Sequence, residues 1–547
     1  MNVSEFELTR RNFLKTTLGA VGAAALPLPA ALAQGSAKYT RYNVMSDGGQ
    51  RALASYKKGV EAMLALPASH PQNWFRNAFI HLMDCPHGNW WFYVWHRGYV
   101  GYFEQTIRNL SGDDSFAMPY WDWTTLPQIP DAMFDGVLTP QSSAFEPYTL
   151  NLAVFTSFIQ PALTKYWNSL TFAQRTQLST RGYKMFSSLW NDVTGFNPAK
   201  PNPQGISGNM AYANPCGSRY LTRDNPKLDA KTAFDVSPDI IYAGLLPTQF
   251  NTSVAADSFT SSKTPSHNTP PGGPDVFSVL EGFPHNKVHN YIGGVGPLDP
   301  GPYGNMTNFL SPVDPIFFLH HSNMDRLWDV WTRKQKSLNL PYLPQGQDLK
   351  TLSDEPFLFY VNGKGEYVGT SHAGEYLSTE RFDYDYEPGF GEETAQPSGA
   401  MLKKRAVLAP LHGAIKGNSA SFAIPSAEMR NQLAAPHAAP LIAEVTLPRP
   451  SATSYEREFD VIVGAPPGVT QVDADSPYYA GTIAFFGPRM NMAGMSPDAT
   501  FSVPLPKAPQ AFRKLAAANA QVEIRVVPSH GLGVAAPALK AASIYVR

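Results

Sequence analysis

One stretch of the sequence, residues 314–326, reads Asp314-Pro315-Ile316-Phe317-Phe318-Leu319-His320-His321-Ser322-Asn323-Met324-Asp325-Arg326. Asp314 is a typical N-cap and Pro315 fits the first position of a helix, so the pattern predicts a helix that begins here. Residues three, four and seven apart lie on one side of a helix, which groups Phe317, His321 and Trp328. The stretch therefore predicts an aromatic helix face that carries a histidine.

Two other stretches are rich in histidine. Residues 79–97 contain three histidines among tryptophan and phenylalanine, namely His81, His87 and His96. The run Pro284-His285-Asn286-Lys287-Val288-His289 places two imidazoles four residues apart on one helical face, with Pro284 at a plausible first helical position. A histidine pair of this kind, taken alone, is more often a surface pair or a satisfied core group than a ligand pair.

Two groups of three histidines favour metal binding, because an unpaired imidazole is costly to bury among aromatic side chains. Imidazole suits zinc, copper, iron and nickel, whereas magnesium and calcium prefer oxygen ligands. The lack of a carboxylate in the set argues against the non-haem iron triad and the carboxylate-bridged di-iron bundles. Zinc stays open for one site, and two facing three-histidine sites suit a copper pair.

The composition excludes several classes of protein. The chain has 547 residues, of which 43% are hydrophobic, 12% aromatic and 16% charged, so it is neither disordered, collagenous nor a coiled coil. The formal net charge is -1, which argues against a nucleic-acid partner.

Residues 1–33 resemble a twin-arginine signal peptide. The pair Arg10-Arg11 precedes an apolar stretch from about residue 18 to 32, and Ala31-Leu32-Ala33 matches a cleavage site. We expect export by the twin-arginine route to the periplasm or the medium, and no membrane association after the signal is removed.

The pattern after the signal predicts two domains and a linker. Residues 34–388 carry helical periodicity, with helices expected over 51–66, 95–108, 172–191 and 315–336. Residues 389–409 lose periodicity and contain the basic Lys403-Lys404-Arg405, a site expected to be open to proteases. Residues 410–547 have period-two runs at 443–447, 459–463, 481–486, 522–527 and 543–546, which predict a sandwich-like all-β domain.

The motifs of the helical part resemble those of the tyrosinase family of type-3 dicopper proteins. His87-x4-Phe92-x2-Trp95-His96-Arg97 matches the family's first copper signature, with Tyr93 where a more apolar residue is usual. Residues 314–325 match the second signature, and residues 118–124 (Met-Pro-Tyr-Trp-Asp-Trp-Thr) resemble the family's PYWDW segment. Tyr384-Asp385-Tyr386 resembles the motif that closes the catalytic domain.

This resemblance implies a mainly α fold, a four-helix bundle with a dicopper centre, followed by the β domain. It implies two copper ions, with O2 as co-substrate. His81, His87 and His96 would bind copper A, and His285, His289 and His321 would bind copper B. We expect His320 to hydrogen-bond in the shell around the ligands. The remaining histidines, His267 among them, are expected to be surface or structural.

The spacing Cys85-Pro86-His87 resembles the C-x-H of relatives in which the thiol is joined to the imidazole by a thioether. The alternatives are a free buried thiol and a disulfide with Cys216, and we favour the thioether.

The resemblance also bears on the activity. It implies ortho-hydroxylation of monophenols and oxidation of o-diphenols to o-quinones. Glu281 and Asn286 are the candidate catalytic residues, because together they could position a water that takes the phenolic proton. Either Asn308 or Phe309 is expected to overhang copper A, and the sequence leaves this open.

The β domain is expected to act as a lid that keeps the enzyme latent. Phe486, Met490 and Met492 are the candidates for a side chain that plugs the site. The expected partners are small phenols, while a homo-oligomer and a copper chaperone stay open. The alternatives are a catechol or o-aminophenol oxidase without hydroxylase activity, a haemocyanin-like oxygen carrier, and a zinc hydrolase, which the lack of an H-E-x-x-H motif disfavours.

Overall fold

The structure, a computed structural model, describes residues 37–194, 219–294, 304–395, 409–425, 427–429, 433, 440–450, 456–487, 496–516, 521–531 and 534–546. Residues from Tyr39 onward form one compact unit. The twin-arginine segment, Cys216, Lys403-Lys404-Arg405, Met490 and Met492 all lie outside the described residues.

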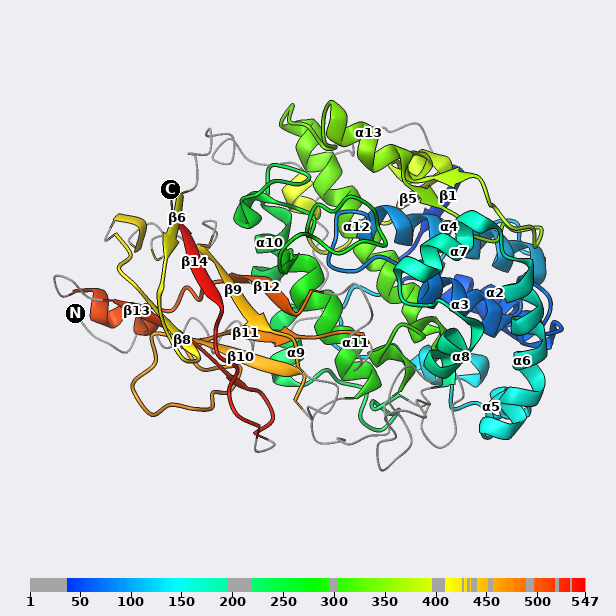
Figure 1. Ribbon diagram of the computed structural model, residues 1–547, viewed down its shortest axis with the longest axis horizontal. Helices are drawn as coiled ribbons and strands as arrows, with labels where there is room; N and C mark the ends of the chain where they lie inside the picture. The colour runs from blue at the N-terminus through cyan, green and yellow to red at the C-terminus, as the bar shows by residue number, and fades with distance from the viewer. Residues whose placement is uncertain are drawn as a thin grey trace. The chain divides into compact units, whose positions relative to one another are not determined.

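The part of the chain before residue 396 is mainly helical (Figure 1). Its helices are α2 (Asp47–Ala65), α3 (Trp74–Asp84), α4 (Phe92–Ser111), α5 (Glu146–Thr149), α6 (Leu152–Ser169), α7 (Phe172–Thr180), α8 (Phe186–Thr194), α9 (Ala230–Asp235), α10 (Pro238–Leu245), α11 (Asn286–Gly293), α12 (Ile316–Ser337) and α13 (Gln347–Asp354). Short strands β1 (Tyr39–Arg41) and β5 (Tyr384–Tyr386) pair in parallel, and β3 (Pro356–Phe357) pairs with β4 (Ser371–His372).

The part after residue 408 is built from strands, drawn in yellow to red in Figure 1. They are β6 (Ala409–His412), β7 (Ala414–Lys416), β8 (Ser419–Phe422), β9 (Ile442–Pro448), β10 (Glu458–Val463), β11 (Tyr479–Ala484), β12 (Asp498–Pro504), β13 (Val522–Pro528) and β14 (Ala541–Val546). Among the described residues these strands and β2 (Asp275–Phe277) form two five-stranded sheets, in the orders β11-β10-β13-β8-β7 and β2-β12-β9-β14-β6. The predicted fold class, a helical domain followed by a β domain, is confirmed.

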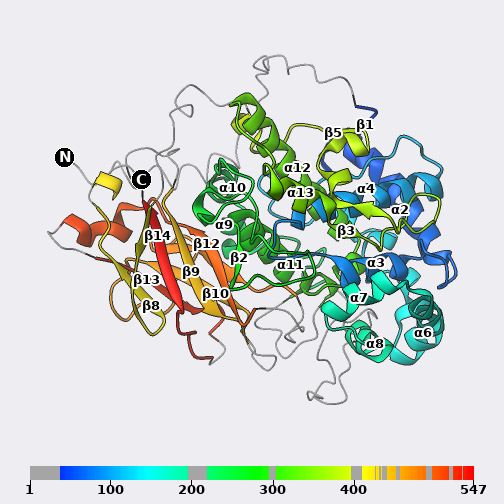
Figure 2. The same ribbon diagram turned by 45° about the horizontal axis from the view of Figure 1, so that its top comes forward.

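One strand of the second sheet comes from the helical part of the chain. β2 (Asp275–Phe277) pairs in parallel with β12, with Phe277 opposite Phe501 (Figure 2). The rings of these two residues stack, with centroids 4.8 Å apart. The sheet therefore contains strands from both sides of the linker predicted at 389–409, a boundary that stays a prediction.

Two details of the helices differ from the predictions. The helix expected over 172–191 is two helices, α7 and α8, because the chain turns at Gly182, whose φ of 100° is open to glycine but disfavoured for other residues. The helix expected at Pro315 begins at Ile316, and Asp314 still accepts a hydrogen bond from the Ile316 N–H at 3.1 Å.

Candidate metal centre

The three histidines of the first predicted group lie together. His81 is in the last turn of α3, His87 is in the loop that follows, and His96 is in α4. The ring centroids are 5.3 Å apart for His81 and His87, and 5.4 Å apart for each of the other two pairs. Helix α3 ends at Asp84 and α4 starts at Phe92, so the loop folds back and carries His87 to the other two rings.

The second group converges in the same way. His289 lies on α11 and His321 on α12, while His285 ends a π-helical turn, Glu281–His285, that leads into α11. The ring centroids are 4.6 to 5.4 Å apart. Pro284 is inside this turn and does not begin a helix as expected. A π-helical turn is wider than an α-helical one, and such turns are frequent at functional sites.

The two groups adjoin each other. His96 of the first group stacks on His321 of the second, with centroids 4.1 Å apart and ring planes within 7°. His87 and His285 face each other across 5.6 Å. Four helices, α3, α4, α11 and α12, thus bring both groups to one place.

Burial keeps these imidazoles neutral. Desolvation lowers the pKa of His81 and of His285 to about 3. It lowers the pKa values of His87, His96, His289 and His321 well below the ordinary value, and neighbouring imidazoles add to the effect. A neutral imidazole has a free lone pair, which is the form that binds a metal.

The hydrogen bonds show where the lone pairs point. His81 Nδ1 bonds to the Phe309 carbonyl at 2.7 Å, and His96 Nδ1 bonds to the Phe92 carbonyl at 2.7 Å. A neutral ring that donates from Nδ1 has its lone pair on Nε2, yet the Nε2 atoms of His81 and His96 are only 3.3 Å apart. Two facing lone pairs repel each other, and a cation between them removes the repulsion.

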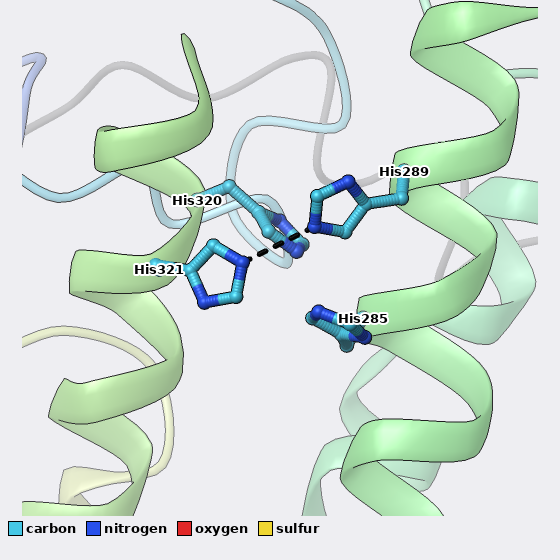
Figure 3. A group of neighbouring side chains, drawn as sticks. All are labelled: His285, His289, His320 and His321. Carbon is cyan, nitrogen blue, oxygen red and sulfur yellow. Dashed lines mark hydrogen bonds between the residues drawn. The ribbon is translucent and has the colours of Figure 1, made fainter. Parts of the chain in front are cut away.

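The second group also has two Nε2 atoms close together, although among the described residues a backbone carbonyl orients only one of the two rings. His289 Nδ1 bonds to the Met306 carbonyl at 2.8 Å, and its Nε2 lies 3.2 Å from His321 Nε2, the pair joined by the dashed line in Figure 3. The Nε2 atoms of His87 and His285 are buried and have no partner among the described residues. The donor set therefore fits two metal ions that prefer nitrogen ligands.

His320 differs from its expected role. It is fully buried, and neither ring nitrogen has a hydrogen-bond partner among the described residues. Its ligand nitrogen and those of His285, His289 and His321 all lie within 4.8 Å of one another, and Figure 3 shows the four rings around one space. The expectation of a hydrogen-bonding shell residue is wrong, because no described acceptor or donor reaches this ring.

Cys85 lies beside His87. Its Sγ is 3.5 Å from His87 Nδ1, and it is described as a free, buried thiol. Burial raises the pKa of the Cys85 thiol to about 12. The sulfur also lies within 4.8 Å of the ligand nitrogens of His81 and His87.

The two predicted catalytic residues are both buried. Asn286 Oδ1 accepts from His285 Nδ1 at 2.9 Å, and Asn286 Nδ2 donates to the Ala484 carbonyl at 3.0 Å. Glu281 accepts hydrogen bonds from the Gly88 N–H at 2.6 Å and from Ser261 Oγ at 2.5 Å. Burial raises the pKa of Glu281 to about 8. Asn286 therefore touches a predicted ligand, whereas the Glu281 carboxyl holds the loop next to His87.

Two phenylalanines cover the histidines. The ring of Phe309 stacks on His87 at 5.0 Å and 7°, while Asn308 turns away and accepts from the Leu310 N–H. Of the two candidates for the residue over the first histidine group, Asn308 and Phe309, it is therefore Phe309 that lies there. Phe486, which follows β11, is 4.3 Å from the His289 ring and 5.0 Å from the His87 ring.

Phe486 packs with the helical core, and its neighbour Phe485 packs with the core of the sheets. Adjacent residues of an extended chain point to opposite sides, which explains the division. Of the three plug candidates, Phe486 is the one within the described residues, and it lies over the histidines.

The β domain is tied to α11 by polar contacts. Lys287 Nζ forms a buried ion pair with Glu458 of β10. Asn290 Nδ2 donates to the Phe485 carbonyl at 3.2 Å and to Glu458 Oε1 at 3.3 Å. With Asn286, three residues of α11 thus contact β10 and the end of β11. The sequence alone does not reveal this set, since polar residues between histidines carry no motif of their own.

A pocket leads to the histidines from the side of His87. His87, Cys85, Arg181, Asn286, Phe309 and Phe486 are among its lining residues. His87 is the one of the six predicted ligands that is not fully buried. The sequence analysis did not single out Arg181, which follows α7 in a segment without a recognisable motif.

Comparison with known proteins gives two profile matches. Residues 62–334 match the common central domain of tyrosinase. Residues 7–27 match the signal sequence of the twin-arginine translocation pathway, so the chain carries an export signal of this route. None of the described helices combines the length and the apolar character that crossing a membrane requires.

The relatives are distant. Chloroplastic polyphenol oxidase II of Ipomoea batatas is 23% identical over 357 residues, which cover 61% of this chain and 47% of that protein. The chain thus spans about half the length of the curated relatives that it matches. The structure of latent apple tyrosinase is 18% identical with a TM-score of 0.50, covering 96% of this chain and 99% of the other.

A latent aurone synthase, itself a polyphenol oxidase, is 17% identical with a TM-score of 0.52, covering 96% of this chain and 92% of the other. At such low identity these two likenesses show the fold. They extend over both the helical part and the β domain.

Proposed function

Because this chain belongs to the tyrosinase and polyphenol oxidase family through its tyrosinase central domain, we propose that it is an exported dicopper enzyme that oxidises phenols with O2. It would ortho-hydroxylate monophenols and oxidise o-diphenols to o-quinones. The observation that carries the proposal is the convergence of six neutral imidazoles, three from each half of the site, in which the Nε2 atoms of His81 and His96 are 3.3 Å apart and those of His289 and His321 are 3.2 Å apart.

In this proposal His81, His87 and His96 hold copper A, and His285, His289 and His321 hold copper B. The copper pair supplies the binding and activation of O2. The chain fixes the imidazoles through the carbonyls of Phe309, Phe92 and Met306, which orient three of the rings. The test is copper stoichiometry with turnover of tyrosine and dopa, and a protein that holds one copper ion would contradict the proposal.

We assign the hydroxylase activity to Asn286 with Glu281. Asn286 contacts the His285 ring at the pocket wall, where its amide could orient a water near the phenolic proton. Glu281 supports this site less directly, because described donors already occupy its oxygens. A lag before tyrosine oxidation, absent with dopa, is the expected kinetic sign.

A catechol oxidase without hydroxylase activity is the second candidate. Phe309 favours it, because a ring stacked on His87 restricts the approach of a phenol to the copper A side. Rapid dopa turnover without tyrosine turnover would support this candidate. Reversible O2 binding without any turnover, even after removal of the β domain, would support an oxygen carrier.

We propose a thioether between Cys85 and His87, supported by the 3.5 Å separation of sulfur and ring nitrogen. One C–S bond would replace the thiol S–H and an imidazole C–H, and the two electrons and two protons released would reduce O2 to hydrogen peroxide. The peptide containing both residues should then weigh two hydrogen atoms less. The protein would be loaded with copper, then unfolded and treated with iodoacetamide. A Cys85 thiol that still reacts would exclude the bond.

We also propose that the β domain keeps the enzyme latent. Phe486 lies over the rings of His87 and His289, in the space that a phenol would need. Expression of the chain truncated after Arg405 should raise diphenolase activity relative to the full chain at equal copper content. An unchanged rate would contradict latency.

A further inference from the structure

We propose that Arg181 recognises a carboxylate on the substrate, so that the preferred phenols carry an acidic group on a short side chain. The inference rests on the proposed phenol-oxidising function and specifies its substrate class. Arg181 lies directly after α7 and lines the pocket together with His87, Phe309 and Phe486.

The guanidinium is buried but incompletely bonded. Arg181 is 8% exposed, its Nη1 donates to Asn268 Oδ1 at 2.9 Å, and its Nη2 donates to the Cys85 carbonyl at 2.8 Å. Its Nε has no hydrogen-bond partner among the described residues. A buried charged donor without a partner is costly, and a ligand anion would remove that cost.

No described carboxylate forms an ion pair with Arg181. Asp84, next to Cys85, accepts from His267 Nε2 at 2.9 Å and from the Trp95 indole at 2.8 Å. Glu355 bonds to the other nitrogen of His267. These two carboxylates are thus committed to the same imidazole, and neither neutralises the guanidinium by contact.

The other arginine of the pocket is different. Arg449 pairs with Asp275 at 2.5 Å, so its charge is already neutralised within the pocket wall. Arg181 therefore supplies the uncompensated positive charge among the described lining residues that lie near His87. Planar guanidinium groups bind carboxylates through two parallel hydrogen bonds, which favours a carboxylate over other anions of similar size.

The position suits a phenol whose ring faces the metal centre. Arg181 Nη2 lies 4.0 Å from Cys85 Sγ, and that sulfur lies 3.5 Å from His87 Nδ1. A ring held beside His87 and Phe309 would direct a para substituent along the pocket toward Arg181. Phenylacetate or phenylpropanoate side chains have the required reach and charge.

The test compares two ligands of equal size, 3-(4-hydroxyphenyl)propanoic acid and its amide. Their binding is measured by calorimetry, which does not depend on turnover, on the full-length, copper-loaded Phe486→Ala variant, in which the ring over His87 and His289 is removed. A charge-assisted hydrogen bond predicts at least about a tenfold preference for the acid. Equal affinities of the two ligands for Phe486→Ala with Arg181 in place would overturn the proposal, and the variants below are made in the same background.

Variants separate recognition from a structural role. Arg181→Gln should reduce the acid preference to within about twofold and leave amide affinity unchanged, while Arg181→Lys should keep part of it. The double variant Arg449→Gln/Asp275→Asn, which removes this ion pair as a whole, is the matched control and should keep the full preference. An acid preference that survives in Arg181→Gln overturns the proposal, as does an equal loss for acid and amide. Absence of copper or of phenol oxidation would instead contradict the proposed function. The ratio of acid affinity to amide affinity could still be measured, so the two proposals can fail independently.

Discussion

The side-chain amide of Asn286 joins His285 to the β domain, because its oxygen bonds to the imidazole and its nitrogen donates to the Ala484 carbonyl 3.0 Å away. A residue expected to help remove a phenolic proton is therefore occupied while the β domain is in place. In this structure the domain covers the histidines with Phe486 and also holds the neighbouring amide.

Replacing Asn286 by glycine should lower monophenolase activity more than diphenolase activity. The reason is that only the monophenol step needs an oriented water to take the phenolic proton. Tyrosine and dopa turnover measured on the same copper-loaded sample give the ratio. Asn290→Gly is the control, since Asn290 also bonds to the β domain but has no contact with His285. Equal losses in both activities would show that Asn286 is not selective.

Replacing Phe486 by alanine in the full chain should raise dopa turnover several-fold, because it removes the ring that lies over His289 and His87 while the rest of the domain stays attached. Phe485→Leu is the matched control, since Phe485 packs into the sheet core. If both variants raise turnover equally, general loosening of the domain, and not the ring, is responsible.

Replacing Lys287 by methionine should weaken the contact between α11 and the β domain. Removing one partner of a buried ion pair costs about 3–5 kcal/mol, because the other charge stays buried. Susceptibility to limited proteolysis and the melting temperature report the change. The double variant Lys287→Met/Glu458→Leu should recover much of the loss, and a double variant as unstable as the single one would argue against this account.

His321→Asn should lower the copper content from two ions to one, whereas His320→Asn should keep both, because the proposal assigns the first residue and not the second as a ligand. Metal analysis after dialysis decides between these outcomes. If His320→Asn loses a copper ion, His320 is itself a ligand, in addition to His285, His289 and His321. In His321→Asn, copper addition should raise the melting temperature less than in the unaltered protein, and in His320→Asn it should raise it by the same amount, since binding stabilises the folded state.

Stability should fall as the pH rises above neutrality because of His267. Burial disfavours its charged form, but Asp84 and Glu355 outweigh burial and raise the pKa of His267. A raised pKa in the folded state stabilises the protein fully below the ordinary value of about 6.5, and this contribution is lost as the pH rises through the folded-state pKa. Melting temperatures across this range should show a decline that His267→Asn makes smaller. The exposed His412→Asn should leave the decline unchanged.

The fold class could be predicted from the sequence because it depends on short-range patterns, and the proposed ligand set rests on patterns of the same kind. The spacing of histidines around His87 and His321 forms motifs, and the period-two runs identify strands such as β9 and β13. The division of 172–191 into two helices was missed, because a single glycine, Gly182, interrupts an otherwise helical pattern.

Contacts between distant parts of the chain could not be predicted. The pairing of β2 with β12, the ion pair of Lys287 with Glu458, and the position of Arg181 beside Cys85 all join residues that carry no mutual signal in one sequence. The choice between Asn308 and Phe309 was open for a similar reason, because it depends on the local turn that Asn308 forms with Leu310.

The parallel pairing of β2 with β12 has a consequence for proteolytic maturation. A cut between residues 395 and 409 would sever the peptide chain but leave the interstrand ladder, the stacked Phe277 and Phe501, and the salt link of Lys287 intact. Cleavage and activation would then be separate events. A cleaved molecule would stay inactive until detergent, acid or a competing strand separates the two fragments.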